Sequence, residues 1–583
     1  MKSSNSTRAI DLSPNALYIL KKRYLKRDSR GRVLESPAEM LRRVAATIAQ
    51  AERKYDSRAD ISAWEDAFYD VMSRLEFLPN SPTLLNAGRL SGQLSSCFVL
   101  PVEDSIASPS IEEAKLVHIS GGGTGFNLSR IRPRDNTSGG PTSFLSPLSS
   151  ATASVKQGGI RRGCNIATLD VHHPDILEFI RTKNACGVLP NFYLSVGVTG
   201  EFIEAVKTGE SYNLVDPANG KTVGTLNAGS VFERIVAQTW KTGDPGLLFL
   251  DRIHVGNPVP ALGEIEGVSG CGEQMLLPYE SCNLGSINLS RMLCADPQDG
   301  VDYVKLAETV RLAGRFLDDV IDINVYPLPQ IAAATLRTRK IGLGVMGFAD
   351  MLILMHIPYD SERAVELAEK VMGFINKEAH RASAALAGER GVFPAYEGSV
   401  YDSPGGTLMR NASCTTIAPT GTISLIAGCS NGIEPLFALV YMRRIMAGNS
   451  LLEVNQEFVR TARQNGFYSD EMLVKLSRGV KLAEIKRVPP GVKRLFVTAP
   501  EIKADWHIRM QAAFQRHVDN AVSKTVNLPH SATLKNVADI YLQAWDEGLK
   551  GITIYRDGSR RRQPLAGRID AGLIADYLKQ NDV

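Results

Sequence analysis

Three cysteines and one glutamate are the residues whose types and spacing could carry a reaction. Cys271 lies in SGCGEQ with Glu273 two residues later, so an extended loop would point the thiol and the carboxylate the same way. Thiols support radical and redox chemistry, and a carboxylate can take or return a proton. Cys282, in ESCNLGSINL, could return on a neighbouring strand and approach Cys97 if their Cα atoms come within about 7 Å.

Other interpretations of these cysteines stay open at this point. The chain has eight cysteines and no CxxC pair, which argues against a zinc site and against a disulfide framework. A cysteine taken alone more often fills the core than carries chemistry. The pair His172–His173 has no HExxH or CxxC context, so we expect it to be structural. No metal site is predicted.

Two segments rich in hydroxyl groups could surround an anion. In APTGTIS, from Ala418 to Ser424, backbone N–H groups and the hydroxyls of Thr420, Thr422 and Ser424 could hold a phosphate if a helix begins there. No Walker lysine follows, which excludes a P-loop. The second segment, 80–83, is followed by Ser95-Ser96-Cys97. Either segment alone could equally be a turn.

A glycine pattern in KIGLGVMG imitates a dinucleotide site. Gly342, Gly344 and Gly347 satisfy GxGxxG, but the preceding TLRTRK is not an apolar strand, as that fold requires. We therefore expect these glycines to allow close helix packing. The chain also lacks DxHxxG, so a cobalamin held through a histidine ligand is not indicated.

These residues need elements to position them, and the chain predicts α/β architecture behind a helical start. Ser36 and Pro37 signal a helix whose apolar residues recur on one face up to Ile48. From about Pro79 short apolar runs alternate with helical periods, such as the one from 306 to 320. GITIYR, at 551–556, predicts a buried strand that ends in a turn at Asp557-Gly558.

Composition indicates a globular enzyme and narrows its partners. Of 583 residues, 66 are Lys or Arg and 62 are Asp or Glu, so the net charge of +4 is too small to predict a nucleic-acid or membrane surface. The apolar run 341–357 is too short and too rich in glycine to span a bilayer comfortably. No secretory signal is visible at the start, so we expect a cytoplasmic protein.

Ordered motifs from about Asn80 to Arg560 give the chain a specific resemblance. They read NSPTLLNAG, SSCFVLP, GGGTGFNLSRIRP, KQGGIRRG, HPDILEFI, CGEQMLLPYESCNLGSINL, RKIGLGVMGFADML, APTGTISLIAGCSNGIEPLF and GITIYRDGSR. With them the chain resembles the large catalytic subunit of ribonucleotide reductases, most closely the adenosylcobalamin-dependent class. The resemblance implies a ten-stranded α/β barrel of two parallel five-stranded halves with a central finger loop. The domains would be a helical segment 1–78, the barrel 79–560, and a tail 561–583 without cysteines.

The resemblance also implies a role for each central residue. A deoxyadenosyl radical from adenosylcobalamin would generate a thiyl radical on Cys271, which abstracts the 3′ hydrogen of the ribose. Glu273 would be the base at the 3′ hydroxyl. Cys97 and Cys282 would supply two electrons as water leaves the 2′ position, and would end as a disulfide. Ser269 stands where the family usually has asparagine, which changes the hydrogen bonding around Glu273.

Substrate and effector contacts follow from the same motifs. The substrate-binding residues would be Ser81, Ser96, Pro419, Thr420, Gly421, Thr422, Ile423 and Ser424. Lys156, Gln157 and Arg161 match the loop that senses a deoxynucleotide effector. The segment between IRPRD and GGPTSFL is shorter than usual for the allosteric loop, so we expect effector control to be simplified or absent.

The partners and the alternatives complete the sequence-based interpretation. The substrate would be a ribonucleotide, with the resemblance favouring diphosphates, and a homodimer is left open. Since no cysteine follows Cys429, an external dithiol such as thioredoxin would re-reduce the site. A class I large subunit, served by a separate radical-generating subunit, carries a Tyr-Tyr pair, whereas Tyr555 here stands alone. A catalytically silent nucleotide-binding relative is the other alternative, motivated by Ser269.

Overall fold

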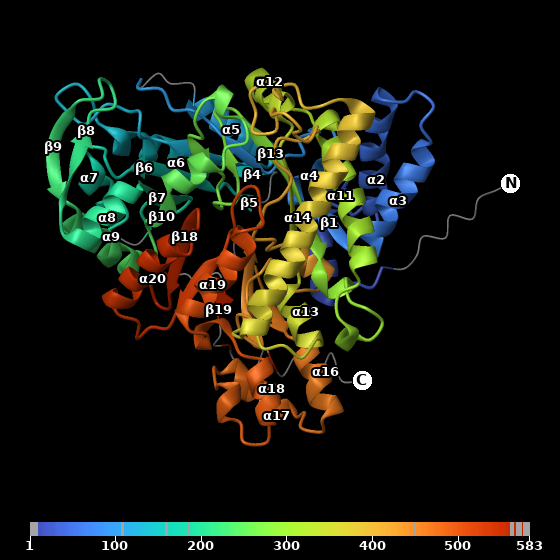
Figure 1. The fold of residues 1–583 in the computed structure, drawn as a ribbon. Helices are drawn as coiled ribbons and strands as arrows, with labels where there is room; N and C mark the ends of the chain where they lie inside the picture. Colours follow the sequence, from blue (N-terminus) through green and yellow to red (C-terminus); the bar gives the residue numbers. More distant parts are fainter. Residues whose placement is uncertain are drawn as a thin grey trace.

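The computed structural model describes residues 10–105, 110–157, 161–184, 187–446 and 449–559, together with positions 565, 566, 569 and 574. Figure 1 shows the N-terminal helices at the right, a barrel in the middle and left, and three short helices below. These three are α16 (Gln456–Gln464), α17 (Asp470–Ser477) and α18 (Pro490–Leu495). The predicted tail beyond Ser559 lies almost entirely outside the described residues.

The chain begins with helices, as predicted. They are α1 (Pro14–Ile19), the π-helical turn η1 (Leu20–Tyr24), α2 (Pro37–Ala49), the 3-10 turn η2 (Gln50–Lys54) and α3 (Ile61–Ser73). Ser36 and Glu39 form a reciprocal capping box that fixes the start of α2. Phe68 on α3 meets Phe316 edge-on, with the ring centroids 5.1 Å apart. These helices therefore pack against the helix of the barrel domain that carries Phe316.

Two sets of parallel strands form the barrel. The first set is β2 (Cys97–Val99), β3 (Gly123–Asn127), β6 (Asn165–Asp170), β7 (Phe192–Val198) and β10 (Gly246–Phe249). The second set is β13 (Ser281–Asn288), β14 (Ile341–Met346), the segment 415–417, β17 (Thr525–Leu528) and β18 (Gly551–Arg556). Each set has five members, as the resemblance implies.

The two halves close on each other at both edges. Antiparallel pairing joins β13 to β2 on one side and β10 to β18 on the other. Within the second half, parallel bridges Leu343↔Thr415 and Ile417↔Val522 carry the sheet across the segment 415–417. The expected ten-stranded barrel of two parallel halves is confirmed. The short strand β1 (Phe77–Pro79) pairs antiparallel with residues 285–287 of β13.

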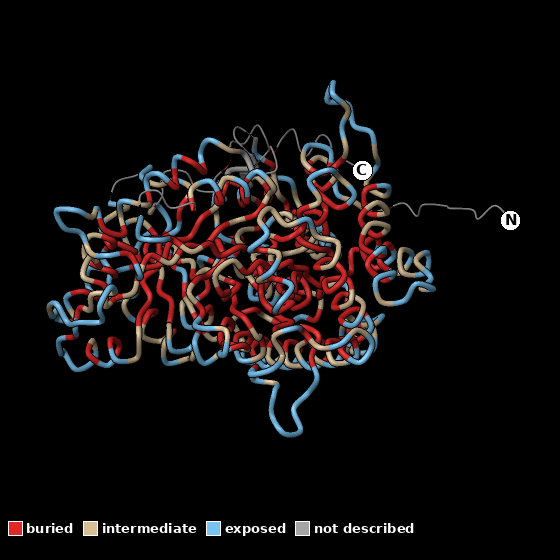
Figure 2. Tube along the Cα trace, turned by 90° about the horizontal axis from the view of Figure 1, so that it is seen from above, coloured by how far each residue is buried: buried red, intermediate tan, exposed pale blue. Residues whose placement is uncertain are grey.

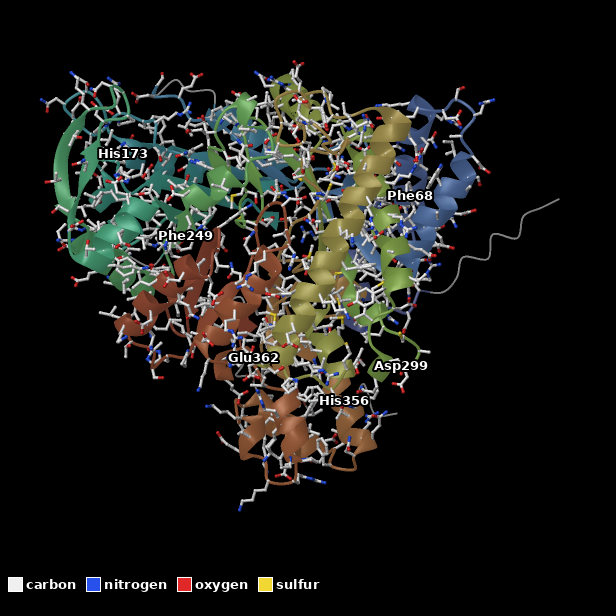
Figure 3. The ribbon with its side chains drawn as sticks, in the orientation of Figure 1. Phe68, His173, Phe249, Asp299, His356 and Glu362 are labelled. Carbon is white, nitrogen blue, oxygen red and sulfur yellow. The ribbon has the colours of Figure 1, made fainter. Side chains whose placement is uncertain are left out.

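Helices surround the barrel and leave its strands buried, as the red interior of Figure 2 shows. The longest are α11 (Tyr303–Ile323), which confirms the predicted period from 306 to 320, and α14 (Glu362–Arg390). Figure 3 places Phe68 among the N-terminal helices at the right and Phe249, on β10, in the left half of the molecule. The remaining helices of eight residues or more are α5 (Ser110–Ser120), α6 (Leu145–Ser154), α8 (Gly200–Thr208), α9 (Ala228–Thr242), α12 (Pro329–Thr338), α19 (Ala504–Gln515) and α20 (Leu534–Asp546).

A small hairpin runs through the middle of the barrel. It consists of β11 (Gly267–Val268) and β12 (Met275–Leu276), joined by the segment 269–274. A Cβ at Gly125 on β3 would lie 1.8 Å from the carbonyl oxygen of Val268, and one at Gly342 on β14 would lie 2.6 Å from Gln274 Nε2. The hairpin thus touches both halves of the barrel, and it is the predicted finger loop.

The glycine pattern at 342–347 has a different packing role from the one predicted. Gly342 and Gly344 lie on strand β14 rather than at a helix contact, and a Cβ at Gly344 would lie 2.2 Å from the carbonyl oxygen of Thr416. Gly347 adopts φ +74° at the start of α13 (Phe348–Leu354). The glycines therefore admit the finger loop and the neighbouring segment 415–417, and the expectation of helix packing is wrong.

Three smaller sheets lie outside the barrel. They are the pair β4 (Lys156–Gln157) and β5 (Arg161–Arg162), the hairpin β8 (Ser211–Val215) and β9 (Thr222–Asn227), and the sheet of β15 (Val440–Met446), β16 (Asn449–Val454) and β19 (Leu565–Ala566). The predicted strand 551–556 is confirmed as β18, followed by a turn in which Gly558 has φ +83°. Among the described residues no helix combines the length and apolarity needed to cross a bilayer.

Candidate active site

The two predicted redox cysteines are direct neighbours across the seam between the barrel halves. Cys97 on β2 and Cys282 on β13 are register partners in the antiparallel pair, a position that brings Cα atoms to about 4.5–5.5 Å. Both thiols are free, and the two residues are 3% and 0% exposed. The expected approach of Cys282 to Cys97 is therefore confirmed, at a separation where a disulfide can form.

Glu273 joins this pair from the finger loop. The Cys97 thiol donates to Glu273 Oε1 at 3.4 Å, and the Ser269 hydroxyl donates to Oε2 at 2.9 Å. Glu273 is 3% exposed. Burial raises the pKa of its carboxyl above the ordinary value, although the hydrogen bonds from Ser269 and Cys97 act the other way. A carboxylate whose pKa lies above its ordinary value is a stronger proton acceptor.

Cys271 lies at the tip of the finger loop, in a tight turn. Gly272 has φ +79°, and its N–H donates to the Ser269 carbonyl at 2.9 Å. The turn leaves Cys271 exposed while Ser269 and Glu273 on either side are buried. The expectation of an extended loop is wrong, because the positive φ of Gly272 turns the chain between Cys271 and Glu273.

The backbone of Glu273 is fixed from the second half of the barrel. Its carbonyl accepts from Thr416 Oγ1 at 2.6 Å and from the Ala521 N–H at 3.1 Å. Sequence analysis missed Thr416, although it stands in CTTIAPTG just before the predicted anion cradle. The side chain of Glu273 therefore contacts the first half of the barrel through Cys97, and its main-chain carbonyl contacts the second half.

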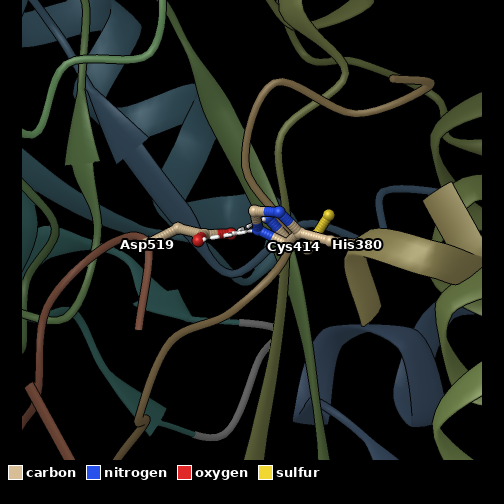
Figure 4. A group of neighbouring side chains, drawn as sticks. All are labelled: His380, Cys414 and Asp519. Atoms are coloured by element: carbon tan, nitrogen blue, oxygen red, sulfur yellow. Dashed lines mark hydrogen bonds and ion pairs between the residues drawn. The ribbon is translucent and has the colours of Figure 1, made fainter. Parts of the chain in front are cut away.

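A group of three side chains, one buried and two half-buried, includes close neighbours in sequence of Thr416 and Ala521 (Figure 4). His380, Cys414 and Asp519 place one ligand atom each within 4.8 Å of one another. Asp519 accepts from His380 Nε2 at 2.9 Å, from the Cys414 N–H at 2.7 Å and from Asn376 Nδ2 at 3.0 Å. Because N–H donors already occupy both carboxylate oxygens, the group is an ion pair that joins 414–415 to 519–521.

A second ion pair, which is fully buried, lies beside Cys282. Sequence analysis also missed its two residues. Lys340 Nζ donates to Glu280 Oε2 at 2.7 Å, with side chains 1% and 2% exposed. Cys282 Sγ contacts the Lys340 carbonyl oxygen at 3.5 Å. Sequence reasoning assigns a lysine before an apolar strand to the surface, since lysine is almost never fully buried unless paired.

The predicted anion cradle adjoins the thiols but uses its hydroxyls unevenly. Ala418 packs in the same small apolar cluster as Cys97 and Cys282. Thr420 Oγ1 accepts from the Gly432 N–H at 2.8 Å, and the buried Ser424 hydroxyl donates to Asn431 Oδ1 at 2.6 Å. These two hydroxyls therefore form hydrogen bonds within the protein.

The remainder of the cradle is open and lies beside arginines. Gly421 is exposed, whereas Pro419 and Thr422 are half-buried. Ile423 begins the short helix α15 (Ile423–Ala427) and is buried. Arg23 Nη1 donates to Thr422 Oγ1 at 3.3 Å, and Arg443 Nη1 donates to the Gly421 carbonyl at 2.9 Å. No sequence motif marked these arginines, because they come from distant segments.

Ser81 and Ser96, the other predicted substrate contacts, lie on either side of Asn80. Asn80 caps helix α4 (Ser81–Asn86) and donates through Nδ2 to Ser96 Oγ at 2.9 Å. The hydroxyls of Ser81 and Tyr24 lie 2.7 Å apart. Both serines are half-buried, and Ser96 Oγ is 3.6 Å from Cys97 Sγ. Ser96 therefore borders the dithiol, and Asn80 connects it to the start of α4, where Ser81 lies.

The predicted effector loop forms a backbone hairpin. Lys156 pairs with Arg162 and Gln157 pairs with Arg161 in the antiparallel strands β4 and β5. The tip, 158–160, and the side chains of these four residues lie outside the described part of the chain. Effector binding at this hairpin stays a prediction.

Comparisons with known proteins agree with this geometry. The ribonucleotide reductase barrel-domain model matches residues 95–555, and the all-alpha-domain model matches 10–92. A vitamin B12-dependent ribonucleoside-diphosphate reductase of Thermoplasma acidophilum is 46% identical, over 95% of this chain and 80% of that protein. Another, from Mycobacterium tuberculosis (strain CDC 1551 / Oshkosh), is 48% identical, over 97% of this chain and 82% of that protein.

A solved structure supports the fold independently. The class Id ribonucleotide reductase alpha subunit of Actinobacillus ureae superposes with a TM-score of 0.77 at 24% identity, covering 94% of this chain and 97% of that one. At this identity the likeness concerns the fold alone. With both domain models matched over most of its length and relatives near half identity, the chain belongs to the ribonucleotide reductase large-subunit family.

Proposed function

We propose that this chain reduces ribonucleoside diphosphates to 2′-deoxyribonucleoside diphosphates with adenosylcobalamin as the radical source. The relatives from Thermoplasma and Mycobacterium are vitamin B12-dependent ribonucleoside-diphosphate reductases, which supports both the cofactor and the diphosphate class. The single observation that carries the proposal is the contact of Cys97 with both Cys282 and Glu273 in one buried cluster. A nucleotide-binding module has no need of a dithiol held against a carboxylate.

Each residue of the cluster has one task in this reaction. As a thiyl radical, Cys271 takes the 3′ hydrogen of the ribose. Glu273 accepts the 3′ hydroxyl proton, and Ser269 orients its carboxylate by the bond to Oε2. Cys97 and Cys282 together lose two electrons and two protons and form a disulfide as the 2′ hydroxyl leaves as water. One of these protons leaves with the 2′ hydroxyl as water, and the other is delivered with one electron to C2′. The second electron and the proton held by Glu273 reduce the transient ketone at C3′, and Cys271 then returns the hydrogen to C3′.

The exposed position of Cys271 suits an external radical source. Adenosylcobalamin, when bound, supplies a 5′-deoxyadenosyl radical able to abstract the hydrogen of a thiol. Cys271 must meet that group, and its exposed side chain at the tip of the finger loop meets this requirement. The carboxylate of Glu273 and the dithiol are buried nearby, and the ribose must lie between them and Cys271 for all four residues to act on it.

The test is turnover without any second subunit. The purified chain is incubated anaerobically with a ribonucleoside diphosphate, adenosylcobalamin and dithiothreitol, and 2′-deoxynucleotide is measured by chromatography. Product that requires the cofactor supports the proposal. Product only with a separate metalloprotein would favour the class I alternative, and nucleotide binding without product would favour the silent relative.

The finer partners form part of the same proposal. A deoxynucleotide effector would bind at the 156–162 hairpin, a dithiol such as thioredoxin would re-reduce the thiols, and a homodimer in the cytoplasm would be the working form. Changes in substrate preference on adding each deoxynucleoside triphosphate test the effector. Light scattering of the purified chain tests the dimer.

A further inference from the structure

The two redox thiols have opposite electrostatic surroundings. Cys97 Sγ lies 3.4 Å from the carboxylate oxygen of Glu273. Cys282 Sγ contacts the Lys340 carbonyl at 3.5 Å and the Asn283 carbonyl at 3.4 Å, and Lys340 carries a buried ammonium. A thiolate formed at Cys97 would face a carboxylate. Asn283, the residue after Cys282, is the register partner of Ile341 on the parallel strand β14, so Lys340 lies beside Cys282 on the neighbouring strand and brings a cation to that position.

The buried ion pair beside Cys282 is asymmetric in its hydrogen bonds. Glu280 accepts from Lys340 Nζ at 2.7 Å, from the Leu277 N–H at 2.7 Å and from Thr338 Oγ1 at 2.6 Å. Three donors therefore share the charge of this carboxylate. Among the described residues, Glu280 is the hydrogen-bond acceptor for Lys340 Nζ, although an ammonium has three protons to donate.

Such a pair is costly to bury. Removing two charges from water costs several kcal/mol per ion, and a hydrophobic pair of similar volume is often as stable. A buried ion pair is therefore weak support for a purely stabilising role. Its position next to a sulfur that must change its bonding gives it a chemical role.

The charges act on the two thiols in different directions. Burial raises the pKa of Cys282 well above its usual value. Of the charges around it, the Lys340 ammonium has the largest effect and lowers this pKa, whereas the carboxylates of Glu280 and Glu273 raise it. Burial also raises the pKa of Cys97, and there Glu273 and Cys282 raise it further. Of the two sulfurs, Cys282 is thus the one with a cation to stabilise a negative charge.

We propose that Lys340 makes Cys282 the leaving thiolate when the Cys97–Cys282 disulfide is re-reduced, so that the reducing dithiol attacks Cys97. This inference rests on the proposed function, because it concerns the disulfide formed in turnover. It adds a direction to the exchange and assigns a task to a residue outside the reacting cluster. Lys340 acts through Cys282 and touches no substrate.

The exchange balances with a dithiol as the only reductant. A reductant thiolate attacks Cys97 Sγ, forms a mixed disulfide and breaks the Cys97–Cys282 bond, which leaves its electron pair on Cys282. The second thiol of the reductant then attacks the reductant sulfur that is bonded to Cys97. This closes the disulfide of the reductant and releases Cys97 as a thiolate. The reductant ends as a disulfide, having transferred two electrons, and both cysteines take up protons.

Trapping the mixed disulfide tests the direction without requiring turnover. The full chain is oxidised to the Cys97–Cys282 disulfide, treated briefly with glutathione, quenched with iodoacetamide and mapped by peptide mass spectrometry. We expect glutathione on Cys97 and the alkyl group on Cys282. The reverse pattern, or equal amounts of the two, would overturn the proposal.

Lys340 variants test the cause of that direction. Lys340→Met and the double variant Lys340→Met/Glu280→Gln remove the charge, the latter without leaving an unpaired carboxylate, whereas Lys340→Arg keeps it. We expect the selectivity for Cys97 and the steady-state rate with dithiothreitol to fall about tenfold in the two neutral variants. Lys340→Arg should restore most of both. Equal selectivity in all the variants would overturn the role of the charge.

A split between the first turnover and later turnovers separates this inference from the proposed function. Pre-reduced enzyme without added reductant forms at most one product per site, and this amount does not depend on re-reduction. We expect the neutral variants to keep the first-turnover product while losing steady-state rate. A parallel loss of both would mean that Lys340 only supports the fold. Absence of product in the wild-type chain would contradict the proposed function and leave the trapping result to stand alone.

Discussion

The two ends of the candidate site are built in different ways. At the reacting end, Cys97, Cys282 and Glu273 are at most 3% exposed; Cys97 donates to Glu273 and packs with Cys282 in one small apolar cluster. At the cradle end, Gly421 is exposed and Thr422 is half-buried. Electrostatic interactions are strongest where water is excluded, so the structure reserves a dry, preformed environment for bond making and leaves the other end accessible to a charged group.

The supporting contacts differ in the same way. The reacting end is tied to both barrel halves, through Cys97 on one side and through Thr416 and Ala521 on the other. The cradle instead receives arginines from separate elements, Arg23 before the barrel and Arg443 from β15. We therefore expect changes at the reacting end to lower kcat and changes at the cradle to raise KM.

The largest effect should come from Glu273→Gln. The amide keeps the shape but cannot accept the 3′ hydroxyl proton, so kcat should fall roughly 10²–10⁴-fold, the usual contribution of a general base. KM should change little. Steady-state kinetics with the substrate varied measure both constants. A variant that keeps wild-type kcat would remove Glu273 from the chemistry.

The ion pair between Asp519 and His380 should make the free energy of unfolding depend on pH in the acid range. Although burial opposes it, hydrogen bonds and the charge of His380 hold the pKa of Asp519 at about 2, below the ordinary 3.8. Because the folded chain stabilises the ionised form, this contribution is complete above about pH 4 and is lost as the pH falls towards 2, amounting to about 2 kcal/mol. Asp519→Asn should lose it at neutral pH.

Urea denaturation at a series of pH values checks this prediction. The free energy of unfolding of the wild type should approach that of Asp519→Asn as the pH falls, because protonation and the substitution both remove the carboxylate. A constant difference between the two proteins down to about pH 2 would contradict the assignment. Leu90→Ala serves as the control, because Leu90 is exposed and its truncation should leave the free energy of unfolding unchanged at every pH. The buried Leu94 would not serve, because its truncation would itself destabilise the fold.

At the cradle, Arg23→Ala should mainly weaken binding. A charge-assisted hydrogen bond contributes about 1.5–3 kcal/mol, so KM for a diphosphate should rise about tenfold or more, with kcat nearly unchanged. Arg23→Lys, which keeps the charge without the fork geometry, should recover part of the loss. A fall in kcat at constant KM would show that the two ends are not separable.

The smallest effect distinguishes two threonines of the same segment. Thr422→Val removes a half-buried hydroxyl and should raise KM about threefold. Thr420→Val removes the acceptor of the Gly432 N–H, and should lower the free energy of unfolding by about 1–3 kcal/mol. Kinetics and denaturation of both variants make the comparison. Exchanged results would mean that the cradle binds through Thr420 instead.

Much of the fold could be predicted because its signals are local or carried by ordered motifs. Ser36 caps α2 as expected, and the apolar period of α11 is visible in the sequence. The approach of Cys97 to Cys282 was predicted as a possible strand pairing and is present. The barrel itself follows from the resemblance, since no local pattern specifies how two five-stranded halves close.

The misses have physical causes that a linear pattern does not contain. The direction of Cys271 depends on the positive φ of Gly272, which reverses a segment that alternation alone reads as extended. The hydroxyls of Thr420 and Ser424 form hydrogen bonds with Gly432 and Asn431, which lie further along the chain. Lys340 is buried only because Glu280 pairs with it, and such pairing joins strands that are distant in sequence.

The central claim is that the thiol of Cys271 carries the radical that starts the reaction. The most direct measurement compares wild-type protein with Cys271→Ser in anaerobic assays containing adenosylcobalamin, a ribonucleoside diphosphate and dithiothreitol, with nucleotide binding followed by calorimetry. The account predicts equal binding by both proteins and deoxynucleotide only from the wild type. Product from Cys271→Ser at the wild-type rate would contradict it.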